Sequence, residues 1–379
     1  MATLPELLKT LVEMDGSDLH IATSTPPQIR VNGRLQRLQQ PELAPSETKQ
    51  LVYSVLTDSQ KKRFEESNEL DFSFGIKAIG ARFRCNVFMQ RGAVGAVYRL
   101  IPEKIRTFQE LGLPPVLANL SERPRGLVLI TGPTGSGKST TLAAMLDKIN
   151  TERHEHILTI EDPIEYIHQH KNCLVNQREV HSDTSSFTNA LRAALREDPD
   201  IVLIGEMRDL ETVESALKIA ETGHLTFGTL HTNSAAQTIN RIIDIFPSGQ
   251  QAQIRTQLSL VLEGIVCQAL LPRADGKGRV CSLEIMVPNS AIRNLIRDDK
   301  VHQIYGSMQT GQDKLGMQTA NQSLASLHMK KLINLETALS ASSNKEELQE
   351  MINRGVGVVA GAGLGRGPGG QRPLTGTRG

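Results

Sequence analysis

A glycine-rich octapeptide near the middle of the chain constrains the fold more than any other feature. It runs from Gly132 to Ser139, reads GPTGSGKS, and fits the pattern G-x-x-x-x-G-K-[ST]. An apolar run at 127–130 precedes it, and a segment with helical character at 140–146 follows it. This motif forms a phosphate-binding loop where a strand leads into it and a helix leaves it. We therefore predict a strand–loop–helix unit that binds a nucleoside triphosphate.

Each residue type in this loop suits phosphate and a divalent cation. The glycines let backbone N–H groups approach phosphate oxygens, and the start of a helix adds favourable partial charge. Lys138 is predicted to reach the β- and γ-phosphates of ATP, and the Ser139 hydroxyl to complete the shell of Mg²⁺. An ordinary dinucleotide-binding fold has no need of this lysine, which argues against that alternative. The predicted nucleotide-binding residues are Gly132, Pro133, Thr134, Gly135, Ser136, Gly137, Lys138, Ser139 and Thr140.

The composition argues against several other classes of protein. At 379 residues the chain is long enough for two domains. A formal net charge of +1 and an aromatic content of 3% disfavour nucleic acid as the main partner, so none is expected. We see neither a signal peptide nor a membrane span, and we expect a cytoplasmic protein with no direct membrane insertion. The four cysteines form no C-x-x-C pair, which predicts reduced thiols and no zinc site.

Residues 1–100 are predicted to form a small α+β domain. Apolar residues at 4–12 share one face of a helix, and Asn32-Gly33 between two alternating segments is typical of a tight hairpin. Further runs at 71–74, 81–88 and 93–100 have the character of antiparallel strands. Residues 101–106 are interpreted as a linker, because Pro102 interrupts regular structure.

The pattern changes to alternating strands and helices beyond the linker. Apolar runs at 127–131, 157–160, 201–204 and 225–230 predict a mainly parallel sheet covered by helices, within a domain that extends from 107 to 354. Helical spacing dominates at 289–297, 301–308 and 322–332. Residues 355–379 are rich in glycine and predict a disordered tail, because they cannot bury enough side chain to order themselves.

An acidic segment follows the second of these predicted strands. Glu161, Asp162 and Glu165 lie within five residues, and carboxylates this close repel one another unless a cation or a hydrogen-bond network separates them. Mg²⁺ and a polarised water would satisfy this requirement. The alternative is an acidic loop in solvent.

The next two strands carry further candidates. Four apolar residues, 201–204, run into Glu206, and a buried parallel strand would place this acid at the carboxyl edge of the sheet, beside the nucleotide. His224 and His231 flank the run at 225–230, and a phosphate-sensing role is favoured over a purely structural one.

Arginines are needed to stabilise the charge that develops in phosphoryl transfer. Arg82 and Arg84 alternate with Phe83 and Cys85, so strand periodicity places both guanidinium groups on one face. Arg241 is a further candidate. Ordinary surface positions are the alternative for all three.

These segments resemble the sequence boxes of the secretion ATPase superfamily, which serves type II secretion, type IV pili and related machines. The octapeptide is similar to the Walker A motif, 159–166 to the Asp box, 198–209 to Walker B and 222–233 to the His box. The resemblance covers nearly all of the chain before the tail. Residues 291–296 read AIRNLI and are similar to a motif of the type IV pilus retraction ATPases within this superfamily. The tetracysteine motif of assembly and secretion members is not in this sequence.

The resemblance implies an α/β architecture with a PAS-like domain at 1–100, a RecA-like ATPase domain at 107–354, and a homohexameric ring. It implies that Glu165 is the catalytic base, with Glu161 as the alternative, and that Glu206 helps to position Mg²⁺ or water. It also implies that His231 and His224 read the γ-phosphate or couple it to domain movement. The implied activity is ATP hydrolysis that drives type IV pilus retraction, with pilin disassembly and twitching motility as its result. The implied partner is the inner-membrane pilus platform protein, with the ring peripheral at the inner membrane.

Three alternatives remain at this point. The chain could be the accessory paralogue of the retraction motor, or an ATPase of the same superfamily that secretes protein or DNA. It could also be a scaffold that binds ATP without useful turnover, although the presence of Glu165, Glu206 and His231 argues against this. For residues 291–296, packing in the core is the alternative to a specific role in retraction.

Overall fold

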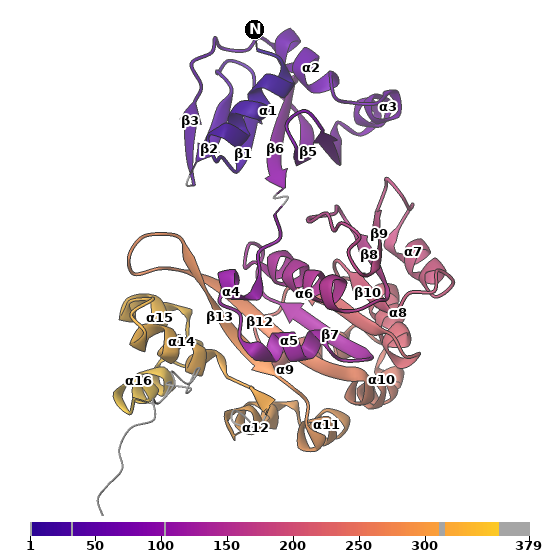
Figure 1. Ribbon diagram of the computed structural model, residues 1–379, viewed down its shortest axis with the longest axis vertical. Helices are drawn as coiled ribbons and strands as arrows, with labels where there is room; N and C mark the ends of the chain where they lie inside the picture. The colour runs from indigo at the N-terminus through magenta and orange to yellow at the C-terminus, as the bar shows by residue number, and fades with distance from the viewer. Residues whose placement is uncertain (1, 32, 102–103, 311–314, 356–379) are drawn as a thin grey trace, which may run out of the picture.

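The computed structural model describes residues 2–31, 33–101, 104–310 and 315–355. The chain has a mixed α/β fold with two β-sheets, one of six and one of seven strands. Each sheet carries its own hydrophobic core, one built from residues of 4–98 and the other from residues of 116–317. We refer to residues 2–101 as the N-terminal unit and to the described residues from 104 onward as the C-terminal unit (Figure 1).

The N-terminal unit is an antiparallel sheet in the order β3-β2-β1-β6-β5-β4. The predicted opening helix is confirmed, with Leu4, Leu7, Leu8 and Leu11 buried against the sheet. The predicted hairpin is also confirmed as β2 and β3, and Gly33 has φ 82°, which fits its turn. Asn32 lies outside the described residues. The elements are β1 (Asp18–Ile21), β2 (Gln28–Val31), β3 (Arg34–Arg37), β4 (Glu69–Ile76), β5 (Ala81–Gln90), β6 (Ala93–Ile101), α1 (Leu4–Glu13), α2 (Pro45–Tyr53) and α3 (Asp58–Ser67).

The C-terminal unit is built on a sheet in the order β13-β12-β7-β11-β10-β8-β9. Its pairs are parallel apart from the antiparallel pair of β12 and β13, so the prediction of a mainly parallel sheet is confirmed. Sequence patterning found four of these strands and missed β9, β12 and β13. The strands are β7 (Gly126–Thr131), β8 (His156–Glu161), β9 (Leu174–Glu179), β10 (Ile201–Ile204), β11 (Leu225–Leu230), β12 (Leu262–Pro272) and β13 (Arg279–Met286).

Helices surround this sheet (Figure 1). They are α4 (Phe108–Leu111), α5 (Pro115–Ser121), α6 (Lys138–Glu152), α7 (Phe187–Ala194), α8 (Leu210–Glu221), α9 (Ala235–Asp244), α10 (Ser248–Val261), α11 (Ser290–Arg297), α12 (Ile304–Thr310), α14 (Ala320–Met329), α15 (Leu335–Ala341) and α16 (Lys345–Asn353), with a 3₁₀ turn at Val301–Gln303. The helices predicted beyond residue 288 are thus present.

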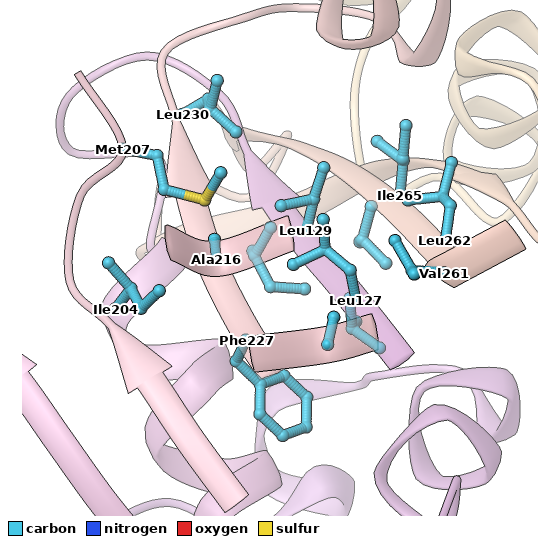
Figure 2. Packing of buried hydrophobic residues seen from close by; sticks show 14 of the residues in the cluster. Leu127, Leu129, Ile204, Met207, Ala216, Phe227, Leu230, Val261, Leu262 and Ile265 are labelled. Carbon is cyan, nitrogen blue, oxygen red and sulfur yellow. The ribbon is translucent and has the colours of Figure 1, made fainter. Parts of the chain in front are cut away.

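The centre of the sheet explains why its strands are continuous apolar runs. Every residue of β7 and β11 is buried, because helices cover both faces of a parallel sheet. Figure 2 shows Leu127 and Leu129 of β7 packed among side chains of β10, β11 and β12. The carboxyl ends of β7, β8, β10 and β11 therefore meet at one rigid edge.

Helix α11 contains the AIRNLI segment. Ile292 and Ile296 are fully buried, whereas Ala291 is exposed, so the buried face is narrower than the sequence predicted. Arg293 donates hydrogen bonds to the carbonyls of Ser259 and Leu260, at 2.8 and 3.1 Å, where α10 ends. A cation here satisfies carbonyls that have no intrahelical partner. The segment thus packs in the core and also caps α10.

Three further observations concern the predicted boundaries and composition. Most of the predicted tail, 356–379, and Pro102 and Glu103 of the predicted linker lie outside the described residues. Within the parts of the chain that the structure describes, no helix is both long and apolar enough to cross a bilayer. All four cysteines are free thiols, three of them buried.

Candidate nucleotide site

One cavity of about 650 Å³ is lined by residues of both units. The phosphate loop, the acidic segment, Glu206 and His231 reach it from the C-terminal unit. Arg84 and Arg99 reach it from neighbouring strands of the N-terminal sheet, where they are paired in register. The volume falls within the range of small-molecule sites. A ligand held here would therefore contact both units at once.

The phosphate loop has the predicted strand–loop–helix form. Gly132, Gly135 and Gly137 all have positive φ, at 137°, 77° and 89°, a backbone conformation that other residues rarely adopt. Helix α6 begins directly afterwards at Lys138, so its first N–H groups, which have no intrahelical partners, lie at the cavity. The Lys138 ammonium donates to the carbonyls of Gly132 and Pro133, at 2.9 and 3.1 Å. Burial lowers the pKa of Lys138, and the charges of Glu206 and Glu165 oppose this shift.

A buried glutamine on β12 holds this loop from behind. The Gln268 side chain donates to the Ser136 carbonyl at 2.7 Å and accepts from the Thr141 hydroxyl at 2.8 Å. A Cβ atom on Gly132 would lie 2.2 Å from the backbone carbonyl oxygen of Gln268. A Cβ atom on Gly137 would lie 2.8 Å from the side-chain nitrogen of Gln268. The close approach of β12 therefore explains why both positions hold glycine.

The acidic segment places its two glutamates in different environments. Glu161 ends β8, is 9% exposed, and accepts hydrogen bonds from the Thr159 hydroxyl at 2.7 Å and the Glu165 amide at 3.4 Å. The Glu165 side chain is half exposed, and one carboxylate oxygen lies 3.9 Å from an Arg84 nitrogen. Glu165 thus has a free oxygen to offer a reacting water, whereas internal donors engage Glu161.

The buried position of Glu161 makes the stability of the chain depend on pH. Burial raises the pKa of Glu161 to about 7, although hydrogen bonds from Thr159, Glu165 and Gln177 act in the opposite direction. Between its ordinary pKa near 4.5 and about 7, the folded chain keeps a proton that the unfolded chain has lost. Stability contributed by this group therefore falls as pH rises through that window.

We expect Glu161→Gln to remove this dependence. As the pH rises from about 5 to about 8, the free energy of unfolding of the wild type should fall relative to that of the variant. The fall should be about 3 kcal/mol at most. Chemical denaturation of both proteins at the two pH values measures this fall. A difference that stays constant with pH would contradict the assigned environment of Glu161.

Glu206 follows β10 at the carboxyl edge, as predicted. Its carboxylate forms an ion pair with Arg208 and lies 2.9 Å from the Nε2 atom of His231. Burial raises the pKa of Glu206, but the Arg208 guanidinium and His231 outweigh that effect and hold the pKa below its ordinary value. The structure thus brings two predicted residues, Glu206 and His231, into direct contact at the cavity.

The two histidines that flank the predicted strand at 225–230 lie far apart in the structure. His231 follows β11 and lines the cavity, whereas His224 precedes the same strand. A six-residue strand is roughly 20 Å long, so the two rings lie at opposite edges of the sheet. The His224 ring contacts the Ile219 carbonyl at 3.0 Å, at the end of α8. Within one chain the His224 ring thus lies at the end of a helix and not at this cavity, and its role stays a prediction.

The three candidate arginines have different positions. Arg82 and Arg84 share the predicted face of β5, opposite the buried Phe83 and Cys85. Arg84 lines the cavity, whereas Arg82 pairs with Glu179 at 3.0 Å, outside the cavity lining. Arg241 lies exposed on α9, and among the described residues it too is outside that lining. Arg84 is thus the one of the three that the fold of a single chain brings to the nucleotide cavity, and the roles of Arg82 and Arg241 in catalysis stay predictions.

The chain matches a known protein family over nearly all of its length. Residues 2–360 match the family described as type II/IV secretion system protein. The chain belongs to this family.

Individual secretion-family relatives agree with the match. The type IV pilus retraction ATPase PilT of Pseudomonas aeruginosa is 54% identical over 335 residues, which cover 88% of this chain and 96% of that protein. The type IV pilus ATPase PilU of the same organism is 43% identical over 350 residues, 92% of this chain and 91% of that protein. A crystal structure of the pilus retraction motor PilT with bound ADP has a TM-score of 0.87 and 52% identity, and covers 93% of this chain and all of that one.

The secretion-family site contains residues that sequence reasoning missed. Gln268, Arg99 and Arg279 lie on strands whose place beside the cavity depends on tertiary structure. Tyr166 and Arg208 had a local signal, since Tyr166 directly follows Glu165 and Arg208 stands two residues after Glu206. The Tyr166 hydroxyl lies 2.9 Å from that of Thr140, and so ties the acidic segment to the start of α6.

The residues of this secretion-family site fit a triphosphate with Mg²⁺. The Ser136 hydroxyl is buried and has no hydrogen-bond partner within the described residues, and Ser139 lines the cavity beside it. In residues 2–31, 33–101, 104–310 and 315–355, no group of three or more His, Cys, Asp or Glu is arranged to hold a metal ion. Mg²⁺ in nucleotide sites takes most of its ligands from phosphate and water, so it needs few protein oxygens. Ser139 and Glu206 would hold it.

Proposed function

We propose that this chain is an ATP-hydrolysing motor that drives type IV pilus retraction. One observation carries the proposal: the phosphate loop, Glu165, Glu206 and His231 line a single cavity in a chain 54% identical to a pilus retraction ATPase. A scaffold that binds ATP without turnover would not require an acid with a free oxygen at this place. Glu165 offers such an oxygen.

The mechanism follows from the roles these groups can perform. The N–H groups at the start of α6 and the Lys138 ammonium hold the phosphates of ATP. Glu165 takes a proton from the attacking water as the bond from water oxygen to γ-phosphorus forms and the bond to the bridging oxygen breaks, which yields ADP and phosphate. Mg²⁺ held by Ser139 and Glu206 would neutralise phosphate charge. Glu206 also holds His231 in place, and Arg84 orients Glu165.

The organisation of the chain is part of the proposal. Residues 1–100 form a PAS-like domain, 101–106 a linker and 107–354 a RecA-like ATPase domain, which accords with a separate sheet and a separate main core in each part. The last helices, α14 to α16, add a smaller cluster of their own. The subunits assemble as a homohexamer. ATP binds between the two domains, so its hydrolysis changes their relative placement and performs work.

The proposed setting is the cytoplasmic face of the inner membrane. The ring is peripheral there and engages the platform protein of the pilus machine, not lipid. This partner follows from the retraction function of the relative PilT. The AIRNLI helix α11 is the segment proposed to serve retraction rather than hydrolysis.

Two measurements test this proposal. The purified full chain should release phosphate from ATP in a Mg²⁺-dependent reaction, and Glu206→Ala should abolish that release. Deletion of the gene should leave pili on the cell surface that fail to retract. Cells without pili would indicate an assembly ATPase instead. Cells whose pili still retract, but weakly, would indicate the accessory paralogue.

A further inference from the structure

A buried carboxylate outside the nucleotide cavity joins the two units of the chain. Glu179 is the last residue of β9 and is 4% exposed. It pairs in register with Glu161, so it lies where the acidic segment leaves β8. A buried carboxylate is costly unless donors surround it, and its partners therefore show what it holds in place.

On the side of the C-terminal unit, Glu179 holds the acidic segment itself. One carboxylate oxygen accepts the Ile164 N–H at 3.1 Å, and the other accepts the Ser182 hydroxyl at 3.1 Å. Ile164 is buried and directly precedes Glu165, the proposed base. The position of the Glu179 carboxylate therefore sets the path of the backbone into Glu165.

On the side of the N-terminal unit, two side chains reach the same carboxylate. The Ser73 hydroxyl of β4 lies 2.8 and 2.7 Å from its two oxygens. The Arg82 guanidinium of β5 donates at 3.0 Å and also contacts Ser73. Charge-assisted hydrogen bonds of this kind are among the stronger ones in proteins. Arg82 is 28% exposed at its side chain, so water screens this pair only in part.

The acidic segment is thus attached to β5 at two successive residues. Arg82 reaches Ile164 through Glu179, and Arg84, two positions further along the same face of β5, reaches the Glu165 carboxylate. If the N-terminal sheet moves away, Glu179 loses its charged partner and its closest hydroxyl. The Ile164 N–H and the Ser182 hydroxyl then remain as donors to its carboxylate, and its position, which sets the backbone path into Glu165, is no longer fixed from the side of the N-terminal unit.

We infer that Glu179 is a positioning residue that makes the placement of Glu165 depend on the docking of the N-terminal sheet through Ser73 and Arg82. This inference rests on the proposed ATPase function and adds to it a named link between domain position and the catalytic base. Arg82 acts in this link through Glu179 and does not touch phosphate. The base is held ready for reaction when the sheet is docked and is released when the sheet departs.

The test compares Arg82→Gln, Ser73→Ala and Glu179→Gln with the wild-type full chain. We expect kcat for ATP hydrolysis to fall about tenfold in each variant, since small misplacements of a catalytic group cost this much or more. Affinity for a fluorescent ADP analogue should stay within about twofold, because the phosphate loop is not involved. Hydrogen exchange of the peptide that contains Ile164 should become faster in all three.

Glu197→Gln is the matched control. Glu197 pairs with Arg178, the neighbour of Glu179 on β9, but this pair lies within the C-terminal unit. The control should leave both kcat and exchange at Ile164 unchanged. The double variant Arg82→Gln/Glu179→Gln should be no slower than the slower single variant, because both changes break one link.

Several outcomes would overturn the inference. The inference is wrong if Arg82→Gln and Ser73→Ala keep the kcat and the exchange rate of the wild type. These two variants alter a partly exposed and a small side chain, so they test the inference even if Glu179→Gln does not fold. Losses that multiply in the double variant would show two independent roles. A wild-type chain that does not hydrolyse ATP would instead overturn the proposed function, and exchange at Ile164 would still report on the link.

Discussion

Glu165→Gln is expected to lower kcat for ATP hydrolysis by about two to four orders of magnitude, the usual contribution of a general base. The amide keeps the size of the side chain but cannot take a proton from water. Glu165 is half exposed at the cavity, and Arg84 contacts one of its oxygens at 3.9 Å. Single-turnover phosphate release with saturating ATP and Mg²⁺ measures the loss.

Glu161→Gln serves as the matched comparison for this experiment. Glu161 is the alternative base, but it is 9% exposed and its carboxylate accepts hydrogen bonds from the Thr159 hydroxyl and the Glu165 N–H. We expect the comparison variant to lose far less turnover than Glu165→Gln. The reverse order of the two effects would transfer the role of base to Glu161.

The second large effect is expected from Lys138→Ala. Removing one partner from a close charge pair costs about 3 kcal/mol, which corresponds to about a hundredfold weaker binding of ATP. Because Lys138 also stabilises the transition state, turnover should become undetectable. Calorimetric titration with a slowly hydrolysed ATP analogue measures the affinity.

Lys148→Ala is the control on the same helix. Lys148 lies near the far end of α6, where it forms ion pairs with Glu122 and Glu152. Lys148 is outside the cavity lining, and its partner carboxylates are more than half exposed, so water weakens these pairs and this variant should bind ATP as the wild type does. Equal affinities of Lys138→Ala and wild type would refute the assignment of Lys138 to phosphate.

The parts of the site that the sequence predicted well are those that have a local sequence pattern. Residues 126–152 form a strand, a loop and a helix in direct succession, and each has a strong local signal. Glu206 was placed correctly because a short apolar run followed by an acid defines the edge of a parallel sheet. These inferences needed no knowledge of distant contacts.

The errors concern geometry that is not local. Arg82 and Arg84 share one face of β5, but they lie two residues apart, and only the docking of the N-terminal unit decides that one reaches Glu179 and the other reaches the cavity. Gln268 lies on β12, which follows α10 without a turn signal, and its contact with the phosphate loop spans more than a hundred residues. His224 differs from these residues, because the length of β11 alone separates it from His231 within one chain.

The contact of β12 with the phosphate loop determines which sequence changes relatives could accept. At Gly132 an added Cβ would meet the backbone oxygen of residue 268, so no exchange of that side chain could make room. At Gly137 the obstacle is the Gln268 side-chain nitrogen, and a smaller residue at 268 would remove it, although the positive φ would remain unfavourable. Alternatives to glycine at 137 should therefore appear only together with a change at 268, whereas position 132 should stay glycine in every lineage that keeps this strand pairing.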